Sequence, residues 1–115
     1  MSTPVLGRRY LAKLERFGLS AALATPFDAD MRIDIDAAIN HAKNCLVNGC
    51  SSVTLFGTTG EGSSISNEER SEMLGPFLKS DIAPEQIVVG VMANSYIDAA
   101  LQSLEALDAG CRNVL

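Results

Sequence analysis

The stretch FGTTGEGSSISNEE, residues 56–69, decides the fold of this 115-residue chain. A run of apolar residues ends at Phe56, two threonines set among glycines follow, and a helix start comes next. Glycine allows the backbone to take positive φ and to approach a ligand closely, while the threonines contribute hydroxyls and amides. In α/β proteins ligands bind at the carboxyl ends of parallel strands. The stretch therefore predicts a βα turn that carries a site.

Strand and helix signals alternate through the rest of the chain. Apolar runs predict strands over residues 19–25, 51–56 and 86–92, and a fourth strand begins at 112–115. We expect the first of these strands to be buried on both faces, as strands of a parallel sheet commonly are. Helical periodicity fills the intervals between the strands. The pattern therefore predicts βαβ units around one parallel sheet, which is an α/β fold.

Capping residues mark where the intervening helices start and end. The starts are indicated by Asp34, by a capping box of Ser66 with Glu69, and by Ser95, and the ends by Gly49 and Gly110. The last helix carries an apolar stripe made of Ile97, Ala100, Leu101, Leu104 and Leu107. The middle helix contains Gly75-Pro76. Because proline removes a hydrogen bond from a helix interior, we expect a kink or a break near Leu74.

Residues 4–17 also have a helical period, with Leu6, Tyr10, Leu14 and Phe17 on one face and basic residues on the others. Gly18 ends this pattern. We expect a helical extension over residues 1–18, which covers the side or the bottom of the domain that follows. Docking of a partner by this helix is the less favoured interpretation.

The composition is that of a globular chain with a net negative charge. Hydrophobic residues make up 47% of the sequence, and 14 acidic against 9 basic residues give a net charge of −5. This balance disfavours nonspecific binding to nucleic acids and to anionic membranes. The three cysteines lack the spacing of a metal site, so we expect reduced thiols in a cytoplasmic protein. His41 is the only histidine, and we expect neither a metal centre nor a role for it in catalysis.

Three patches of the sequence resemble one family. LATPFD at residues 23–28, GTTGE at 57–61 and VGVMANS at 89–95 occur in the order found in the pyruvate-dependent Schiff-base aldolases, which include dihydrodipicolinate synthase and N-acetylneuraminate lyase. The resemblance runs over residues 19–115. It implies a (β/α)8 TIM barrel, of which this chain would hold three βα units and the start of a fourth strand. We therefore expect residues 19–115 to form a partial barrel domain.

The resemblance also implies an activity and its site residues. Members condense or release pyruvate through an imine on a lysine, with pyruvate or another 2-oxo acid and an aldehyde as substrates and no cofactor, and a homo-oligomer is expected. Thr58 would join a proton relay, and Thr59 with the amides of Gly57 and Gly60 would hold the pyruvate carboxylate. Their positions along the chain, apart from the resemblance, suggest three supporting residues: Thr25 at the end of the first strand, Glu61 just after the turn and Asn94 at the end of the third strand. For Glu61 we favour a structural role, in which its carboxylate accepts bonds from backbone N–H groups and holds the loop, over a role as a general base. Thr58 slightly favours a synthase, or a related sugar-acid aldolase, over a neuraminate lyase.

The imine-forming lysine of the family lies in the second half of the barrel. Lys13, Lys43 and Lys79 fall on predicted helices, so we expect the 115-residue chain alone to be inactive.

Two non-catalytic interpretations stay open. The turn at residues 57–60 is also suited to a module that binds small carboxylates without chemistry, because its amides suit an anion. Alternatively, the chain is an assembly element whose unpaired strand edges associate with other copies. The face of the sheet that would line the barrel interior is expected to be apolar, which would favour association.

Overall fold

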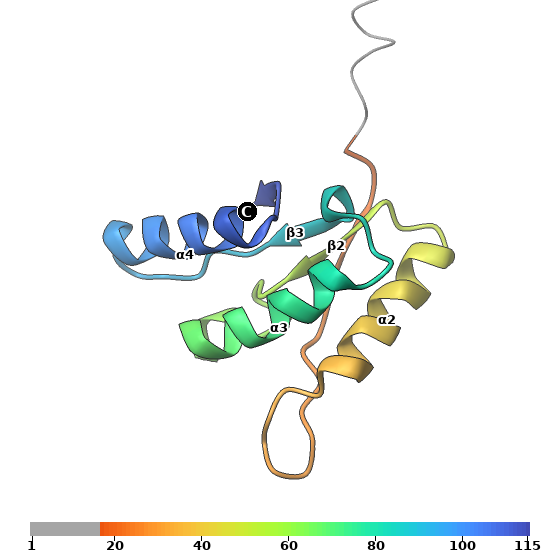
Figure 1. Cartoon of the computed structure of the whole chain (residues 1–115), viewed down its shortest axis with the longest axis horizontal. Helices are drawn as coiled ribbons and strands as arrows, with labels where there is room; N and C mark the ends of the chain where they lie inside the picture. Colours follow the sequence, from red (N-terminus) through yellow and green to blue (C-terminus); the bar gives the residue numbers. More distant parts are fainter. Residues whose placement is uncertain (1–16) are drawn as a thin grey trace, which may run out of the picture.

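The strands lie side by side in chain order in one parallel sheet. The computed structural model describes residues 17–115, and its strands are β1 (Ser20–Ala22), β2 (Ser52–Leu55), β3 (Ile87–Val89) and β4 (Asn113–Val114). The connections run through the helices α2 (Ile35–Val47), α3 (Asn67–Lys79) and α4 (Tyr96–Ala109), with short 3-10 turns η1 (Gly62–Ser64) and η2 (Pro84–Gln86) (Figure 1). The predicted α/β fold is confirmed. The helix expected over residues 4–17 lies outside the described residues, apart from Phe17.

The two faces of the sheet differ in chemistry, and the strand register shows how. Successive residues of a strand point to opposite faces, and Ala22, Thr54, Val88 and Asn113 stand side by side. One face carries Leu23, Val53, Leu55, Ile87 and Val89, all of which join the buried core with residues of the three helices. The opposite face carries Ser20, Ala22, Ser52, Thr54, Val88 and Asn113.

The side chains on the face away from the helices are therefore mostly small or polar, with Val88 as an apolar member. The hydroxyls of Ser20 and Thr54 share a hydrogen bond of 2.8 Å across β1 and β2. Our expectation of a largely apolar inner face was wrong, because its positions on β1 and β2 hold serine, alanine and threonine and that on β4 holds Asn113, whereas Val88 of β3 is apolar as expected.

The predicted helix boundaries are confirmed by their caps. The Asp34 carboxylate accepts a hydrogen bond from the Ala37 amide at 3.1 Å. Ser66 and Glu69 exchange both bonds of a capping box, at 3.1 and 3.0 Å. The hydroxyl of Ser95 accepts from the amide three residues on, and α4 ends at a left-handed glycine. The helices thus begin and end where short polar side chains or glycine satisfy the free backbone groups.

Two expectations about individual elements were wrong. The first is that β1 is buried on both faces: β1 is short and only partly buried, and Leu19 beside it is 65% exposed. Among residues 17–115 it is an edge strand with a neighbour on one side only. The second is the break near Leu74, since α3 runs without interruption through Pro76. Gly75 has no Cβ to clash with the proline ring, and the buried Phe77 continues the packed face beyond the proline.

The outer side of α4 is exposed. Its stripe residues Ile97, Leu101, Leu104 and Leu107 are between 47% and 57% accessible, and the buried residue of the helix is Ala106. The helical period of the stripe is correct, but described residues do not cover it. No helix between residues 17 and 115 has both the length and the apolar character needed to cross a membrane.

Candidate functional site

The turn that follows β2 is tightly closed by its own backbone. The Gly62 amide donates to the Gly57 carbonyl at 3.0 Å, and the Glu61 amide donates to the Thr58 carbonyl at 3.1 Å. Phe56, the residue that enters the turn, is completely buried and has a φ of 59°. A left-handed backbone is costly for a bulky residue and persists only where its surroundings enforce it. The turn is therefore a strained segment at the carboxyl end of β2.

The turn presents its two threonines to solvent. Thr58 and Thr59 are exposed, Gly57 is half-buried and Gly60 is buried. Among residues 17–115, the amides of Thr58 and Thr59 donate no hydrogen bond. The carboxyl end of β2 thus holds two hydroxyls and two free N–H groups, and such groups can bind an anion such as a carboxylate.

The predicted supporting residues differ in what they contact. Thr25 is buried, and its hydroxyl donates to the Gly60 carbonyl at 2.7 Å, which ties the end of β1 to the turn. Glu61 is exposed and has a left-handed backbone, and its side chain does not cap the η1 turn that follows. Asn94 is exposed in the bend after β3. Within residues 17–115 the turn is held by backbone hydrogen bonds and by Thr25, and the expected cap from the Glu61 carboxylate is not formed.

Two glycines far apart in the sequence leave room for the Phe56 peptide. A Cβ built on Gly62 would lie 1.8 Å from the Phe56 carbonyl oxygen, and one built on Gly90 would lie 2.6 Å from the same atom. No side chain fits at either distance. The end of β2, the start of η1 and the end of β3 are therefore in backbone contact around Phe56.

Arg70 of α3 holds these three segments together. Its side chain is 3% exposed. Nη1 donates to the Gly90 carbonyl at 2.8 Å and Nη2 to the Gly62 carbonyl at 3.2 Å, while the guanidinium carbon lies 4.7 Å from the centre of the Phe56 ring. Nε is buried, and no described residue accepts a hydrogen bond from it. Burial lowers the pKa of Arg70, and the negative charge of Glu105 opposes this shift.

Sequence reasoning missed Arg70, although a signal was present. Met73, Leu74 and Phe77 form the buried face of α3, and Arg70 lies three, four and seven residues before them. The same helical spacing places Arg70 on this face. Gln102 of α4 was also missed, and it accepts a hydrogen bond from the Met92 amide at 3.1 Å. A single glutamine on an amphipathic helix carries no comparable signal.

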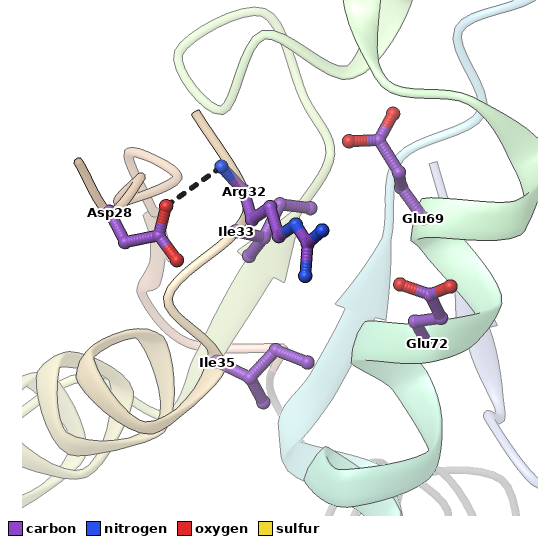
Figure 2. Close-up of a pocket in the computed structure, with 6 residues that line it drawn as sticks. All are labelled: Asp28, Arg32, Ile33, Ile35, Glu69 and Glu72. Carbon is purple, nitrogen blue, oxygen red and sulfur yellow. Dashed lines mark hydrogen bonds between the residues drawn. The ribbon is translucent and has the colours of Figure 1, made fainter. Parts of the chain in front are cut away.

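A separate open pocket of about 480 Å³ lies between the loop after β1 and the first turns of α3. Figure 2 shows the Arg32 side chain reaching across it toward α3, where Glu69 and Glu72 line the other side. The Asp28 carboxylate accepts a bond from the Arg32 amide at 3.0 Å and so shapes the loop. None of the threonines or glycines of the turn lines this pocket.

With this geometry established, comparisons with known proteins identify its relatives. A profile of the dihydrodipicolinate synthetase family matches residues 15–115. The 4-hydroxy-tetrahydrodipicolinate synthase of Corynebacterium urealyticum is 31% identical over 111 residues, which are 95% of this chain and 37% of that protein. The corresponding synthase of Pseudomonas putida is 33% identical over 93 residues, or 81% of this chain and 32% of that protein.

A solved structure is also similar. The dihydrodipicolinate synthase of Agrobacterium tumefaciens is 60% identical, with a TM-score of 0.83 over 87% of this chain and 35% of that one. The chain thus spans between 32% and 37% of the length of these three relatives. Its strands and helices are those of the N-terminal part of a TIM barrel, as expected. The chain belongs to the dihydrodipicolinate synthetase family.

Proposed function

We propose that this chain supplies the pyruvate-binding turn of a Schiff-base aldolase of the dihydrodipicolinate synthase type. The observation that carries the proposal is the pair of exposed threonines with free amides at the carboxyl end of β2, in a chain that belongs to this family. In this proposal the hydroxyl of Thr59 binds the carboxylate together with amides of the turn, including those of Gly57 and Gly60. Thr58 passes a proton toward the reacting carbon. The aldehyde partner is not assigned.

The chemistry suits these residue types. A carboxylate gains charge-assisted hydrogen bonds from converging N–H and O–H donors. A threonine hydroxyl both donates and accepts, so it can hand on a proton without becoming ionised. The tie from Thr25 to Gly60 at 2.7 Å would keep these donors in one arrangement, which reduces the reorganisation that binding requires.

The lysine that forms the imine is proposed to lie outside these 115 residues. Lys43 is on α2 and pairs with Asp81 at 3.6 Å, and Lys79 ends α3. Neither follows a strand, so neither is suited to meet a ligand at the carboxyl edge of the sheet. The chain alone would then bind pyruvate weakly and form no imine. A homo-oligomer in the cytoplasm completes the proposal, and the three free thiols support the location.

Trapping with borohydride tests the proposal. The 115-residue chain and a hybrid are each mixed with pyruvate and borohydride, and their intact masses are then measured by mass spectrometry. In the hybrid, residues 17–115 replace the matching part of the Agrobacterium tumefaciens synthase. We expect a reduced pyruvate adduct on the hybrid and none on the chain. A soluble, folded hybrid that forms no adduct would contradict the aldolase assignment.

Two substitutions in the hybrid separate the roles of the threonines. Thr58→Val removes the relay hydroxyl, so kcat falls by about 100-fold with little change in KM for pyruvate. Thr59→Val removes a ground-state contact, so KM rises and kcat changes less. Thr58→Ser is the matched control because it keeps the hydroxyl. If both valine variants raised KM alone, the relay role would be wrong, and binding without chemistry would be the better description of the turn.

A further inference from the structure

The most deeply buried charge among the described residues is the guanidinium of Arg70. Burying an arginine is costly unless its donors find acceptors. Within residues 17–115, Arg70 donates to two backbone carbonyls, and its Nε has no hydrogen-bond partner. A methionine or leucine at this position would continue the apolar face of α3 without this cost. Packing alone therefore does not explain why a charge is placed here.

The position of the two carbonyls does explain it. Gly62 starts η1 and Gly90 follows β3, and both glycines contact the carbonyl group of Phe56. Arg70 thus pulls together the two backbone segments that enclose the strained residue, and its charged group stacks on the ring of the same residue. A planar fork of donors can bridge two carbonyls at once, which an ammonium group does less well.

We propose that Arg70 is a positioning residue that holds the left-handed Phe56 and thereby the orientation of Thr58 and Thr59. Phe56 is two residues before Thr58 and has a φ of 59°, so its backbone sets the direction in which the turn leaves β2. Without the two guanidinium hydrogen bonds, Phe56 relaxes toward an ordinary backbone conformation, and Thr58 and Thr59 turn away from the carboxyl edge of the sheet. The consequence for pyruvate rests on the proposed function, whereas the effect on the turn does not.

Hydrogen exchange in the full 115-residue chain tests the effect on the turn. The amides to follow are those of Gly62 and Gly90, which donate to Gly57 and Leu55 at 3.0 and 2.7 Å. In Arg70→Met we expect their exchange to accelerate by about tenfold more than that of the α2 amides, because the turn opens locally. Arg112→Met is the matched control, since Arg112 is exposed and pairs with Glu85 at 3.4 Å at the other end of the sheet.

Arg70→Lys keeps the positive charge but not the two-pronged guanidinium group. If the methionine variant does not fold, the lysine variant tests whether Arg70 holds the turn. We expect intermediate acceleration at the same two amides, with the α2 amides unchanged. Equal acceleration in the turn and in α2 would mean that Arg70 contributes only to global stability. That result, or unchanged exchange at Gly62 and Gly90, would overturn the inference.

The hybrid connects the turn to function. With Arg70→Lys we expect kcat/KM for pyruvate to fall by about tenfold or more, because the donors are misplaced, while the melting temperature stays close to that of the parent hybrid. An inactive parent hybrid would contradict the proposed function, and the exchange result would still decide the role of Arg70 in the turn. An active parent with unchanged kcat and KM in Arg70→Lys would overturn the link between Arg70 and the site.

Discussion

Helices α3 and α4 have similar apolar periodicity but opposite surroundings. Met73, Leu74 and Phe77 of α3 are each at most 4% exposed, whereas Leu101 and Leu104 of α4 are 47% and 56% exposed. α3 lies between its two neighbouring helices and contacts both, while the outer side of α4 is open in residues 17–115. A helical period therefore shows which residues share a face. What covers that face depends on the elements beside it.

The largest test of this contrast removes one large side chain from each helix. Phe77→Ala empties a completely buried position and should lower the free energy of unfolding by about 3–5 kcal/mol. Leu104→Ala on α4 should change it by about 0.5 kcal/mol or less, since the side chain is half in solvent already. Urea denaturation with a constant m-value measures both. Similar losses would mean that α4 is covered in solution.

A second test concerns the closely packed backbone around Phe56. Gly62→Ala would place a methyl group against the Phe56 carbonyl and should cost about 2 kcal/mol or more. Gly57→Ala is the control, because a Cβ there would meet only the Thr54 methyl group at an ordinary 3.8 Å. A well-tolerated Gly62→Ala would show that the turn is less tightly packed than its backbone contacts imply.

Self-association tests the open side. We predict that the purified 115-residue chain associates at micromolar concentration, because α4 exposes a continuous apolar stripe. Replacing Leu101 and Leu104 by glutamate should lower the weight-average sedimentation coefficient toward that of a monomer. Glutamates at the exposed Asn40 and Asn44 of α2 add the same charge and should not. A sharp monomer boundary for the unmodified chain would refute the prediction.

The smallest effect on stability is expected at Cys111, a buried residue that follows the end of α4. Burial raises the pKa of this thiol above its ordinary 9.0. In the unfolded chain the thiol ionises first as the pH rises, so the free energy of unfolding should fall above about pH 9. Cys111→Ala should remove that part of the pH dependence. Denaturation under reducing conditions at neutral and alkaline pH measures the difference, and identical pH profiles would argue against the burial.

The elements that sequence patterns predicted well are those with local causes. Caps at Asp34 and Ser66 act within three residues, so they can be read from short spacings. The turn at Thr58 and Thr59 was placed at the end of β2 because glycines and a helix start follow an apolar run. The binding of the pyruvate carboxylate by Thr59 and the transfer of a proton by Thr58 stay predictions.

What patterns did not predict depends on residues distant in the chain. The contacts of Arg70 join positions 8 and 20 residues away, and the exposure of α4 depends on what lies beside it. The uninterrupted course of α3 through Pro76 has this origin only in part: packing of Phe77 depends on distant residues, whereas Gly75 beside the proline is a local cause. The expectation of an apolar inner face failed for a simpler reason. Ser52 and Thr54 alternate with Val53 and Leu55 in the sequence, so one face of β2 could have been predicted to carry hydroxyls.

The strand order has a consequence for how this chain reaches its structure. Each strand of the described sheet pairs with the one before it, as Ser52 does with Ser20 and Ile87 with Val53. The pairings within residues 17–115 can therefore form as soon as each new strand is synthesised. Separations of about 30 residues keep the entropy of loop closure low and favour rapid folding. We therefore expect the βα units to fold one after another during synthesis on the ribosome, with each new strand pairing with the exposed edge of the sheet already formed.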